Sequence, residues 1–437
     1  MLLESLDTIP WHTLEHAYGE AGDIPRLLRD LTSVDEEVRQ NAQTTLGFTV
    51  YHQGTVYSST AYVVPFFCEL LEATHQEEEQ LWFLTFFIDI ARDSSFLDFY
   101  VTLDRQRPTQ VGESPDMLTQ ELSWVRAAQE AVSAGYSTYV RLLQEKDAKL
   151  RAYAALTLGL CQYHAEQVIP AVLEQLTLEQ EQTVRITLLL SLGQLMPWNE
   201  RAHNLFTQVL NDSRRPVESI AAAIACAFSA REATPPEVVH ALLKSYEQAS
   251  WMGEAFRATS YAEYDLHVCL SQAFRAIGLT LAPLVIPTLL FALKRSDYYS
   301  ALILVDHVLY FTLEGKVITD EMTASDLSRM QREVLWALVA YEDLWEFQEM
   351  MFTVGKYFRP LLTWRAWTRR RNEVIAFLYD TEQGSMRLAE FIQQAATMGL
   401  SPRRAMELLR IEDLNDLDYQ EALERLQHRL REEGQAE

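Results

Sequence analysis

A short motif recurs along the chain and limits the fold more than any other feature. The motif is an acidic residue, two variable positions, Val or Leu, Arg, six variable positions, Leu and Gly. It starts at residues 35, 147 and 181, and a degraded copy with Ser219 at the Arg position starts at 215. The last three copies are 34 residues apart, and the apolar positions of each share one helical face. The motif therefore predicts repeated amphipathic helices.

A second motif places a proline after Ile or Val in four amphipathic segments. These segments are DIPRLLRDL, VVPFFCELL, VIPAVLEQL and VIPTLLFAL, with Pro25, Pro65, Pro170 and Pro287. Proline is tolerated in the first turn of a helix, where its missing N–H has no intrahelical partner to lose. We therefore expect each proline to mark a helix start.

Two short helices within 34 residues form a hairpin that cannot bury its apolar face alone. Hairpins that stack on one another cover these faces and build a continuous core along the array. The chain also has few turn-forming residues, 15 Gly and 14 Pro in 437, and many good helix formers. The sequence thus predicts an all-α fold, a right-handed α-solenoid of helical hairpins.

The proline of the first helix and the acid, Val and Arg of the second together resemble the HEAT-repeat family. The segments WHTLEHAYGEAGDIPRLL, HQGTVY and QREVLWAL are also similar to a group of bacterial HEAT-repeat proteins. The resemblance implies a HEAT-like fold, which by itself carries no function. It also implies that the acid and Arg of each motif form ladders between repeats. The residues concerned are Asp35, Arg39, Asp147, Arg151, Glu181 and Arg185.

The length of the chain predicts more than one core or an extended array. At 437 residues the chain exceeds the usual limit of about 250 to 300 residues for a single core. We expect the solenoid to occupy residues 1–315, with inserted loops near 93–117 and 250–266. We expect residues 316–437 to form a C-terminal helical region that continues or caps the solenoid.

The cysteines and the apolar runs indicate the compartment. Cys68, Cys161, Cys226 and Cys269 are too irregularly spaced for a metal site or a disulfide framework, so we expect buried free thiols and a reducing environment. The longest apolar run, 281–293, is shorter than the roughly 20 residues of a membrane span. The N-terminus is acidic where a secretory signal would be basic. These features predict a cytoplasmic protein without a membrane partner.

The net charge of −25 is unevenly distributed. Residues 1–110 contain 18 acidic and 6 basic residues, a net charge of −12. Such a field repels nucleic acids at long range and attracts basic partners. Solubility alone is the simpler explanation of the charge. For a binding protein, we therefore expect a protein partner with a basic surface in preference to nucleic acid.

The polar segment YHQGTVY, 51–57, interrupts helical sequence on both sides. Gly54 fits the left-handed glycine with which a reversing helix commonly ends, and Ser58, Ser59 or Thr60 fits the cap of the next helix. A connection between hairpins is therefore the simpler interpretation. The alternative is a small polar recognition site at the end of the array. Its candidate residues are His16, Tyr18, His52, Gln53 and Tyr57.

The segment 357–372 interleaves arginine with tryptophan. Its candidate partner-binding residues are Trp364, Arg365, Trp367 and Arg369. Such a mixture can hold phosphate or stack on bases, or it can form a protein-binding surface. It can also pair internally with the acidic run at 342–349, and this interpretation is favoured in a chain of such negative charge.

The chain lacks the familiar local signatures of hydrolases, nucleotide-binding enzymes and zinc proteases. Asp306 with His307, and Asp89 with Asp93, are polar positions within apolar helices, where hydrogen-bonded core residues are more common than catalytic ones. We therefore predict no catalytic, cofactor-binding or metal-binding residue.

The expected function is that of a non-catalytic scaffold which binds a protein on its concave face. One alternative is an acidic immunity or inhibitor protein against a basic toxin. The other is a HEAT-fold enzyme of the DNA glycosylase or bilin lyase type, although the negative charge disfavours a DNA groove and no chromophore pocket is indicated. The oligomeric state stays open.

Overall fold

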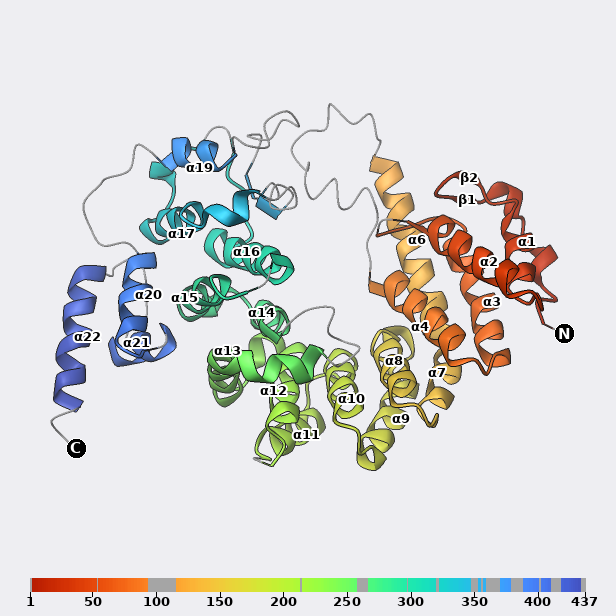
Figure 1. The fold of residues 1–437 in the computed structure, drawn as a ribbon, viewed down its shortest axis with the longest axis horizontal. Coiled ribbons are helices and arrows are strands. Elements are labelled where there is room, and N and C mark those ends of the chain that lie inside the picture. Colours follow the sequence, from red (N-terminus) through yellow and green to blue (C-terminus); the bar gives the residue numbers. More distant parts are fainter. Residues whose placement is uncertain are drawn as a thin grey trace. The chain divides into compact units, whose positions relative to one another are not determined.

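The structure is a computed structural model whose described residues are predominantly helical (Figure 1). The described residues are 2–52, 54–92, 115–212, 214–257, 266–296, 298–319, 322–346, 353–354, 357–358, 370–378, 388–400, 402–409 and 418–433. The named strands among them are four strands of two residues each. The predicted all-α class is therefore confirmed.

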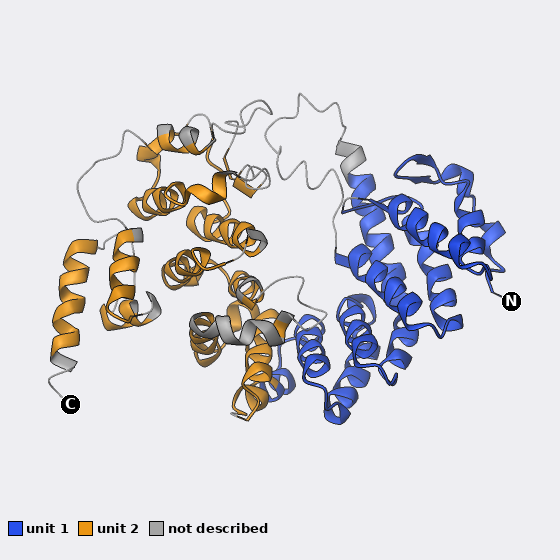
Figure 2. Ribbon diagram, in the orientation of Figure 1, with its two compact units in different colours: residues 1–205, 259–261 blue, residues 206–258, 262–437 orange. Residues whose placement is uncertain are grey.

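The chain divides into two compact units (Figure 2). Unit 1 comprises residues 1–205 and 259–261, and unit 2 comprises residues 206–258 and 262–437. The division falls within helix α11, Glu200–Leu210. The change of region that the sequence suggested after residue 315 stays a prediction.

Unit 1 contains the first three copies of the motif. Its elements are η1 (Leu6–Thr8), η2 (Trp11–Thr13), β1 (Glu15–His16), β2 (Gly19–Glu20), α1 (Ile24–Asp30), α2 (Glu36–Thr49), β3 (Tyr51–His52), β4 (Thr55–Val56), α3 (Thr60–Ala73), α4 (Glu77–Arg92), α6 (Pro115–Ala134), α7 (Tyr136–Leu142), α8 (Ala148–Gly159), η3 (Gln162–His164), α9 (Ala165–Leu178) and α10 (Gln182–Leu195).

Unit 2 contains the degraded copy of the motif and the C-terminal helices. Its elements are α12 (Pro216–Ala230), η4 (Arg231–Ala233), α13 (Pro236–Arg257), α14 (Leu266–Ile277), η5 (Leu279–Leu281), α15 (Ala282–Leu293), α16 (Tyr298–Leu313), η6 (Ala324–Asp326), α17 (Arg329–Val339), η7 (Glu342–Glu346), α19 (Arg370–Leu378), α20 (Leu388–Thr397), α21 (Pro402–Leu409) and α22 (Tyr419–Glu433).

The repeat prolines lie deeper in their helices than predicted. Pro25 alone of the four lies within the first two positions, in α1. Pro65, Pro170 and Pro287 each occupy the sixth position, of α3, α9 and α15 respectively, so the prediction that they mark helix starts is wrong. A proline there removes one bond to the carbonyl four residues earlier. Val64, directly before Pro65, is fully buried, and packing of this kind compensates for the lost bond.

In unit 1 the second helices of successive hairpins stack on one another. Helix α4 packs on α8, and α8 packs extensively on α10. Small residues permit a close approach of α8 and α10. The Ser191 hydroxyl of α10 donates directly to the Ala155 carbonyl of α8 at 2.8 Å. A Cβ atom on Gly159 would lie only 3.0 Å from the Cα of Ser191. The glycine that ends the motif thus lets the two helices meet.

In unit 2, as in unit 1, helices that are near in the sequence pack on one another. Helix α12 packs against α13 and α14, α14 packs against α16, and α16 packs against α17. The helices α20, α21 and α22 pack on one another. Leu423 and Leu426 of α22 are buried, so other parts of the chain cover these apolar side chains of the last described helix.

The two predicted loops lie largely outside the described residues, which exclude 93–114 and 258–265. Helix α6 begins at Pro115, within the first predicted loop. Helix α13 continues to Arg257, so the first part of the loop predicted over 250–266 is helical. Phe256 is fully buried there, which explains why the helix extends further than the polar sequence suggested.

The acid of the motif lies at the N-cap of the second helix in each hairpin of unit 1 that carries a full copy. Asp35 accepts a hydrogen bond from the backbone N–H of Glu37 at 2.9 Å, and Asp147 accepts one from Leu150 at 2.7 Å. Glu181 occupies the same N-cap position but makes no capping bond through its side chain. These acids therefore start helices, whereas the resemblance implied a role between repeats.

The Arg of the motif lies four residues after the N-cap and bonds the turn that joins the two helices. Arg39, Arg151 and Arg185 donate to the carbonyls six residues earlier, at 2.8, 2.9 and 3.1 Å. Arg185 also bonds the Leu176 carbonyl, nine residues earlier, at 2.7 Å. In the degraded copy, Ser219 also bonds the carbonyl nine residues earlier, that of Leu210. The shared position therefore closes the hairpin turn even after the arginine is lost.

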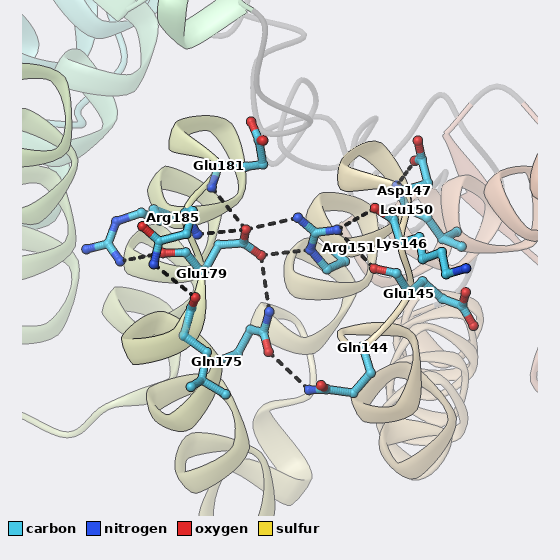
Figure 3. A network of polar contacts seen from close by, with 12 residues as sticks. Gln144, Glu145, Lys146, Asp147, Leu150, Arg151, Gln175, Glu179, Glu181 and Arg185 are labelled. Carbon is cyan, nitrogen blue, oxygen red and sulfur yellow. Dashed lines mark hydrogen bonds and ion pairs between the residues drawn. The ribbon is translucent and has the colours of Figure 1, made fainter.

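Arg151 also reaches a carboxylate beyond its own helix. Arg151 donates through Nε and Nη2 to the two carboxylate oxygens of Glu179, at 2.8 and 2.9 Å (Figure 3). The Glu179 side chain is 3% exposed and also accepts bonds from Gln175 and from the backbone N–H groups of Gln180 and Glu181. Because α8 carries Arg151 and Glu179 follows α9, this pair ties one hairpin to the next.

The environment of Glu179 stabilises the charged carboxylate. Burial alone opposes ionisation, but the hydrogen bonds from Arg151, the Glu181 backbone and Gln175 outweigh it and hold the pKa of Glu179 at about 2. In the first hairpins the equivalent pair is more open. Arg39 Nε bonds Glu79 at 3.2 Å, with side chains 19% and 20% exposed.

Gly159→Ala tests the close packing of α8 and α10. We expect the free energy of unfolding to fall by about 1 to 3 kcal/mol, because the new methyl group overlaps the backbone of Ser191. Gly47→Ala is the matched control, since Gly47 ends its own copy of the motif with open space around its Cβ. There we expect a gain of up to about 1 kcal/mol from helix propensity. Urea unfolding followed by circular dichroism measures both, and equal losses would contradict the packing account.

Glu179→Gln tests the buried ion pair through its dependence on pH. The folded pKa of about 2 lies below the ordinary value of 4.5. The stabilisation by the carboxylate is therefore complete above about pH 4.5 and is lost as the pH falls through 2. We expect wild type to exceed the variant by roughly 3 kcal/mol at pH 7 and the difference to vanish near pH 2. Urea midpoints across this range measure it, and a difference independent of pH would exclude the carboxylate as its source.

Candidate functional site

Two β-hairpins interrupt the helices at the beginning of unit 1. Strand β1 pairs antiparallel with β2, with His16 opposite Gly19, and β3 pairs with β4, with His52 opposite Thr55. Gly54 has φ +81° and lies in the turn of the second hairpin. The predicted left-handed glycine is therefore present, but it turns a β-hairpin, because α2 already ends at Thr49.

Backbone hydrogen bonds hold the two β-hairpins side by side. The Ala17 N–H donates to the Thr49 carbonyl at 2.9 Å, which joins the first hairpin to the end of α2. The Ser59 N–H donates to the Glu15 carbonyl at 3.2 Å, and the Glu15 N–H donates to the Ser58 hydroxyl at 2.8 Å. Residues far apart in the sequence are thus fixed together by main-chain geometry.

The Thr60 side chain holds the second β-hairpin, β3–β4, in place through two hydrogen bonds. Its side chain is fully buried and donates to the Val50 carbonyl at 2.6 Å. The same hydroxyl accepts a bond from the Tyr57 N–H at 2.8 Å. Because one buried hydroxyl bonds both ends of β3–β4, the position of Tyr57 relative to α2 depends on it.

His16 is held by two hydrogen bonds and is only 8% exposed. Its Nδ1 accepts from the Tyr18 N–H at 3.1 Å, and its Nε2 lies 3.0 Å from the Asp23 carboxylate. Since Nδ1 is an acceptor, a neutral ring carries its proton on Nε2 and donates it to Asp23. With both ring nitrogens bonded, His16 positions the first hairpin and Tyr18.

Tyr18 is the exposed residue of this group, at 67%. The centroid of its ring lies 6.4 Å from that of His16 and 5.6 Å from that of His52. Burial raises the pKa of Tyr57, and the charges of Glu121 and Tyr18 raise it further, so these groups also lie near one another. We call His16, Tyr18, His52 and Tyr57 the hairpin surface.

The hairpin surface has one unused polar atom and an acidic surround. The Nδ1 atom of His52 is buried and has no hydrogen-bond partner among the described residues. Glu15 and Glu20 are exposed on the first hairpin, and Asp23 is half-buried beside His16. The arrangement is suited to holding a positively charged group against an aromatic ring.

The sequence had grouped four of these residues correctly, in that the structure brings His16, Tyr18, His52 and Tyr57 together. Gln53, the fifth, lies outside the described residues. Sequence reasoning missed Asp23, Glu121 and Thr60 as contributors. The available signal for Asp23 was its place seven residues after His16, directly before α1.

The second predicted site falls on residues that the structure does not describe. Trp364, Arg365, Trp367 and Arg369 all lie outside the described residues. Arg371, from the same segment, donates to the Val339 carbonyl at 2.8 Å and pairs with Glu342. For this arginine the favoured interpretation, internal pairing with the acidic run, is confirmed.

The polar positions within apolar helices make internal hydrogen bonds. Asp306 pairs with Arg275 at 2.9 Å and accepts a bond from the Tyr357 hydroxyl at 3.2 Å. The Nδ1 of His307 lies 2.7 Å from the Ile303 carbonyl, one turn earlier in α16. Asp89 is half-buried, and Asp93 lies outside the described residues. These contacts agree with the structural interpretation of Asp306 and His307.

The described residues offer little for metal or thiol chemistry. No group of three or more His, Cys, Asp or Glu side chains among them is arranged to hold a metal ion. All four cysteines are free, and Cys161, Cys226 and Cys269 are buried. Burial raises the pKa of Cys68 to about 11 and that of Cys226 to about 12. Neither thiol is therefore a nucleophilic thiolate near neutral pH.

Within the described part of the chain, no single helix combines the length and apolar character needed to cross a membrane. One pair of segments, Cys269–Ile277 and Leu279–Leu293, reaches that length only across a bend of 110°.

Comparisons with known proteins identify no family for this chain. No family model and no curated protein matches the chain. Among solved structures, a crystal structure of an engineered protein from the Northeast Structural Genomics Consortium aligns over 94% of this chain and 99% of its own. The identity is 13% and the TM-score 0.26, so this similarity supports no conclusion about fold or function.

Thr60→Val tests whether the buried hydroxyl positions the hairpin surface. We expect the free energy of unfolding to fall by about 1 to 3 kcal/mol, because the buried Val50 carbonyl and the part-buried Tyr57 N–H lose their partner. Hydrogen exchange at Tyr57 should accelerate at least tenfold, as its N–H loses its acceptor. Thr157→Val is the control, since that buried hydroxyl bonds only within its own helix, to Tyr153. Exchange at Tyr57 that is equal in the two variants would refute the role of Thr60.

Proposed function

We propose that the protein is a non-catalytic binding module that recognises a protein partner with a basic surface through the hairpin surface. The observation that carries the proposal is Tyr18, whose aromatic ring is 67% exposed and contacts the rings of two histidines, His16 and His52. Aromatic residues held by their neighbours are effective interface anchors because little side-chain freedom is lost on binding.

The charge around Tyr18 supports a basic partner. Glu15 and Glu20 are exposed on the hairpin that carries Tyr18, Asp23 bonds His16 just before α1, and residues 1–110 carry a net charge of −12. A guanidinium or ammonium group over the Tyr18 ring gains a cation–π interaction while it pairs with these carboxylates. The same charge draws a basic partner in and repels nucleic acid.

The proposal extends to the array behind the hairpin surface. The 34-residue spacing of the motif and the stacking of α4, α8 and α10 support a right-handed, HEAT-like α-solenoid whose concave face adds contact area. The free cysteines support a reducing compartment such as the bacterial cytoplasm. Rigid stacking of this kind lowers the ordering cost of association.

Tyr18→Ala tests the proposed function. Wild-type and variant proteins are used to capture partners from an extract of the cells that produce the protein, and the bound proteins are identified. We expect Tyr18→Ala to reduce capture of the specific partner at least tenfold, because removing an interface anchor typically costs about 2 kcal/mol or more. Raising the salt from about 0.05 to 0.5 M should also weaken the complex, since screening reduces charge attraction.

Tyr163→Ala is the matched control for this experiment. Tyr163 is 50% exposed on the same unit but lies in η3, away from the residues of the hairpin surface. Its replacement should leave capture unchanged. Equal capture by wild type and Tyr18→Ala would refute the proposal, as would recovery of nucleic acid in place of a protein.

A further inference from the structure

A cavity of about 250 Å³ lies at the turns of the first two hairpins of unit 1. Its walls come from the α1–α2 turn, the first turns of α2, the end of α3 and the start of α4. The hairpin surface follows the other end of α2, a helix of 14 residues and therefore roughly 20 Å long. The cavity is thus a separate feature.

The cavity contains the Arg39–Glu79 pair, the open counterpart of Arg151–Glu179. Arg151 uses all three of its guanidinium nitrogens, on Glu179 and on two backbone carbonyls. Arg39 uses Nε on Glu79 and Nη1 on the Ser33 carbonyl, and its Nη2 has no hydrogen-bond partner among the described residues. The first pair therefore keeps donors that the buried pair does not.

Glu79 likewise keeps capacity to accept. One carboxylate oxygen accepts from Arg39 at 3.2 Å, and the other accepts from the Thr74 hydroxyl at 2.6 Å. A carboxylate has about four acceptor positions, so each oxygen can take a further donor. With both side chains about 20% exposed, the pair presents one positive and one negative group to the same cavity.

The rest of the wall is partly apolar. The cavity is lined by three buried apolar side chains, those of Leu31, Leu70 and Phe83. Leu2 also lines it and is 44% exposed. A cavity of this size fits a molecule smaller than a typical drug. The net charge of −12 on residues 1–110 disfavours a simple organic anion, whereas a molecule of zero net charge meets no such repulsion.

We propose that this cavity binds a free α-amino acid with an apolar side chain. The carboxylate of the amino acid bonds Arg39 Nη2, its ammonium group bonds Glu79, and its side chain packs on Leu31, Leu70 and Phe83. The zwitterion thus matches the pair in charge and the wall in polarity. This site is independent of the hairpin surface and of the partner proposed for it.

Calorimetric titration of the full-length protein with L-leucine tests the proposal. We expect saturable binding with a dissociation constant of about 1 mM or lower. Leucinamide lacks the carboxylate and 4-methylpentanoate lacks the ammonium group, so each should bind at least tenfold more weakly. Absence of leucine binding up to about 10 mM would overturn the proposal. Equal binding of all three compounds would also overturn it.

Two variants locate the binding in the cavity. Arg39→Met removes the carboxylate donor and should weaken leucine binding at least tenfold, with folding checked by circular dichroism. Ala73→Phe fills the cavity from an exposed position that leaves the ion pair intact, and it should abolish binding. Ala127→Phe, at an exposed position in α6, is the matched control and should bind as wild type does. Leucine binding that persists in Ala73→Phe would place the site elsewhere and refute the proposal.

Discussion

The helical hairpins depend on one hydrogen bond. The side chain at the Arg position of the motif, four residues after the helix N-cap, donates to a backbone carbonyl near the preceding turn. The end of a helix leaves carbonyls without intrahelical donors, and a long guanidinium reaches them from the next helix. Arg39, Arg151 and Arg185 all bond the carbonyl six residues earlier, and Ser219, with a much shorter side chain, bonds the carbonyl nine residues earlier, as Arg185 also does. Once the turn is closed, the apolar faces of both helices point in a common direction, and stacking follows.

An Arg–Glu ion pair of the same kind occurs in two different surroundings, at Arg151–Glu179 and at Arg39–Glu79. Where Gln175 and two backbone N–H groups complete the shell of Glu179, the pair with Arg151 is sealed and acts as a joint between hairpins. Where that shell is incomplete, at Arg39 and Glu79, the charges stay accessible. A repeated architecture can therefore gain a binding position by losing a few hydrogen bonds, with no new fold.

The helical class and the repeat were predictable because both are periodic signals. The positions of Pro65, Pro170 and Pro287 were not, since burial of the residues before each proline extends the helix backward at the expense of one hydrogen bond. The β-hairpins were missed because strands of two residues have no periodicity to detect. The sequence analysis did not single out Glu179, because only the three-dimensional approach of Arg151 marks it. Grouping His16 and Tyr18 with His52 and Tyr57 succeeded because the two segments flank the first helical hairpin, α1–α2, which brings its two ends together.

The contact between Gly159 and Ser191 bears on how such a chain can lengthen during evolution. Each full copy of the motif brings its own glycine at the same place, and α10 already carries Gly193 two residues after Ser191. Tandem duplication of one 34-residue segment would therefore set a new serine against an old glycine and reproduce the interface. Insertions of other lengths would rotate bulkier side chains into the gap. Recombination that adds or removes 34 residues is thus tolerated. The contact between Gly159 and Ser191 is what sets this length.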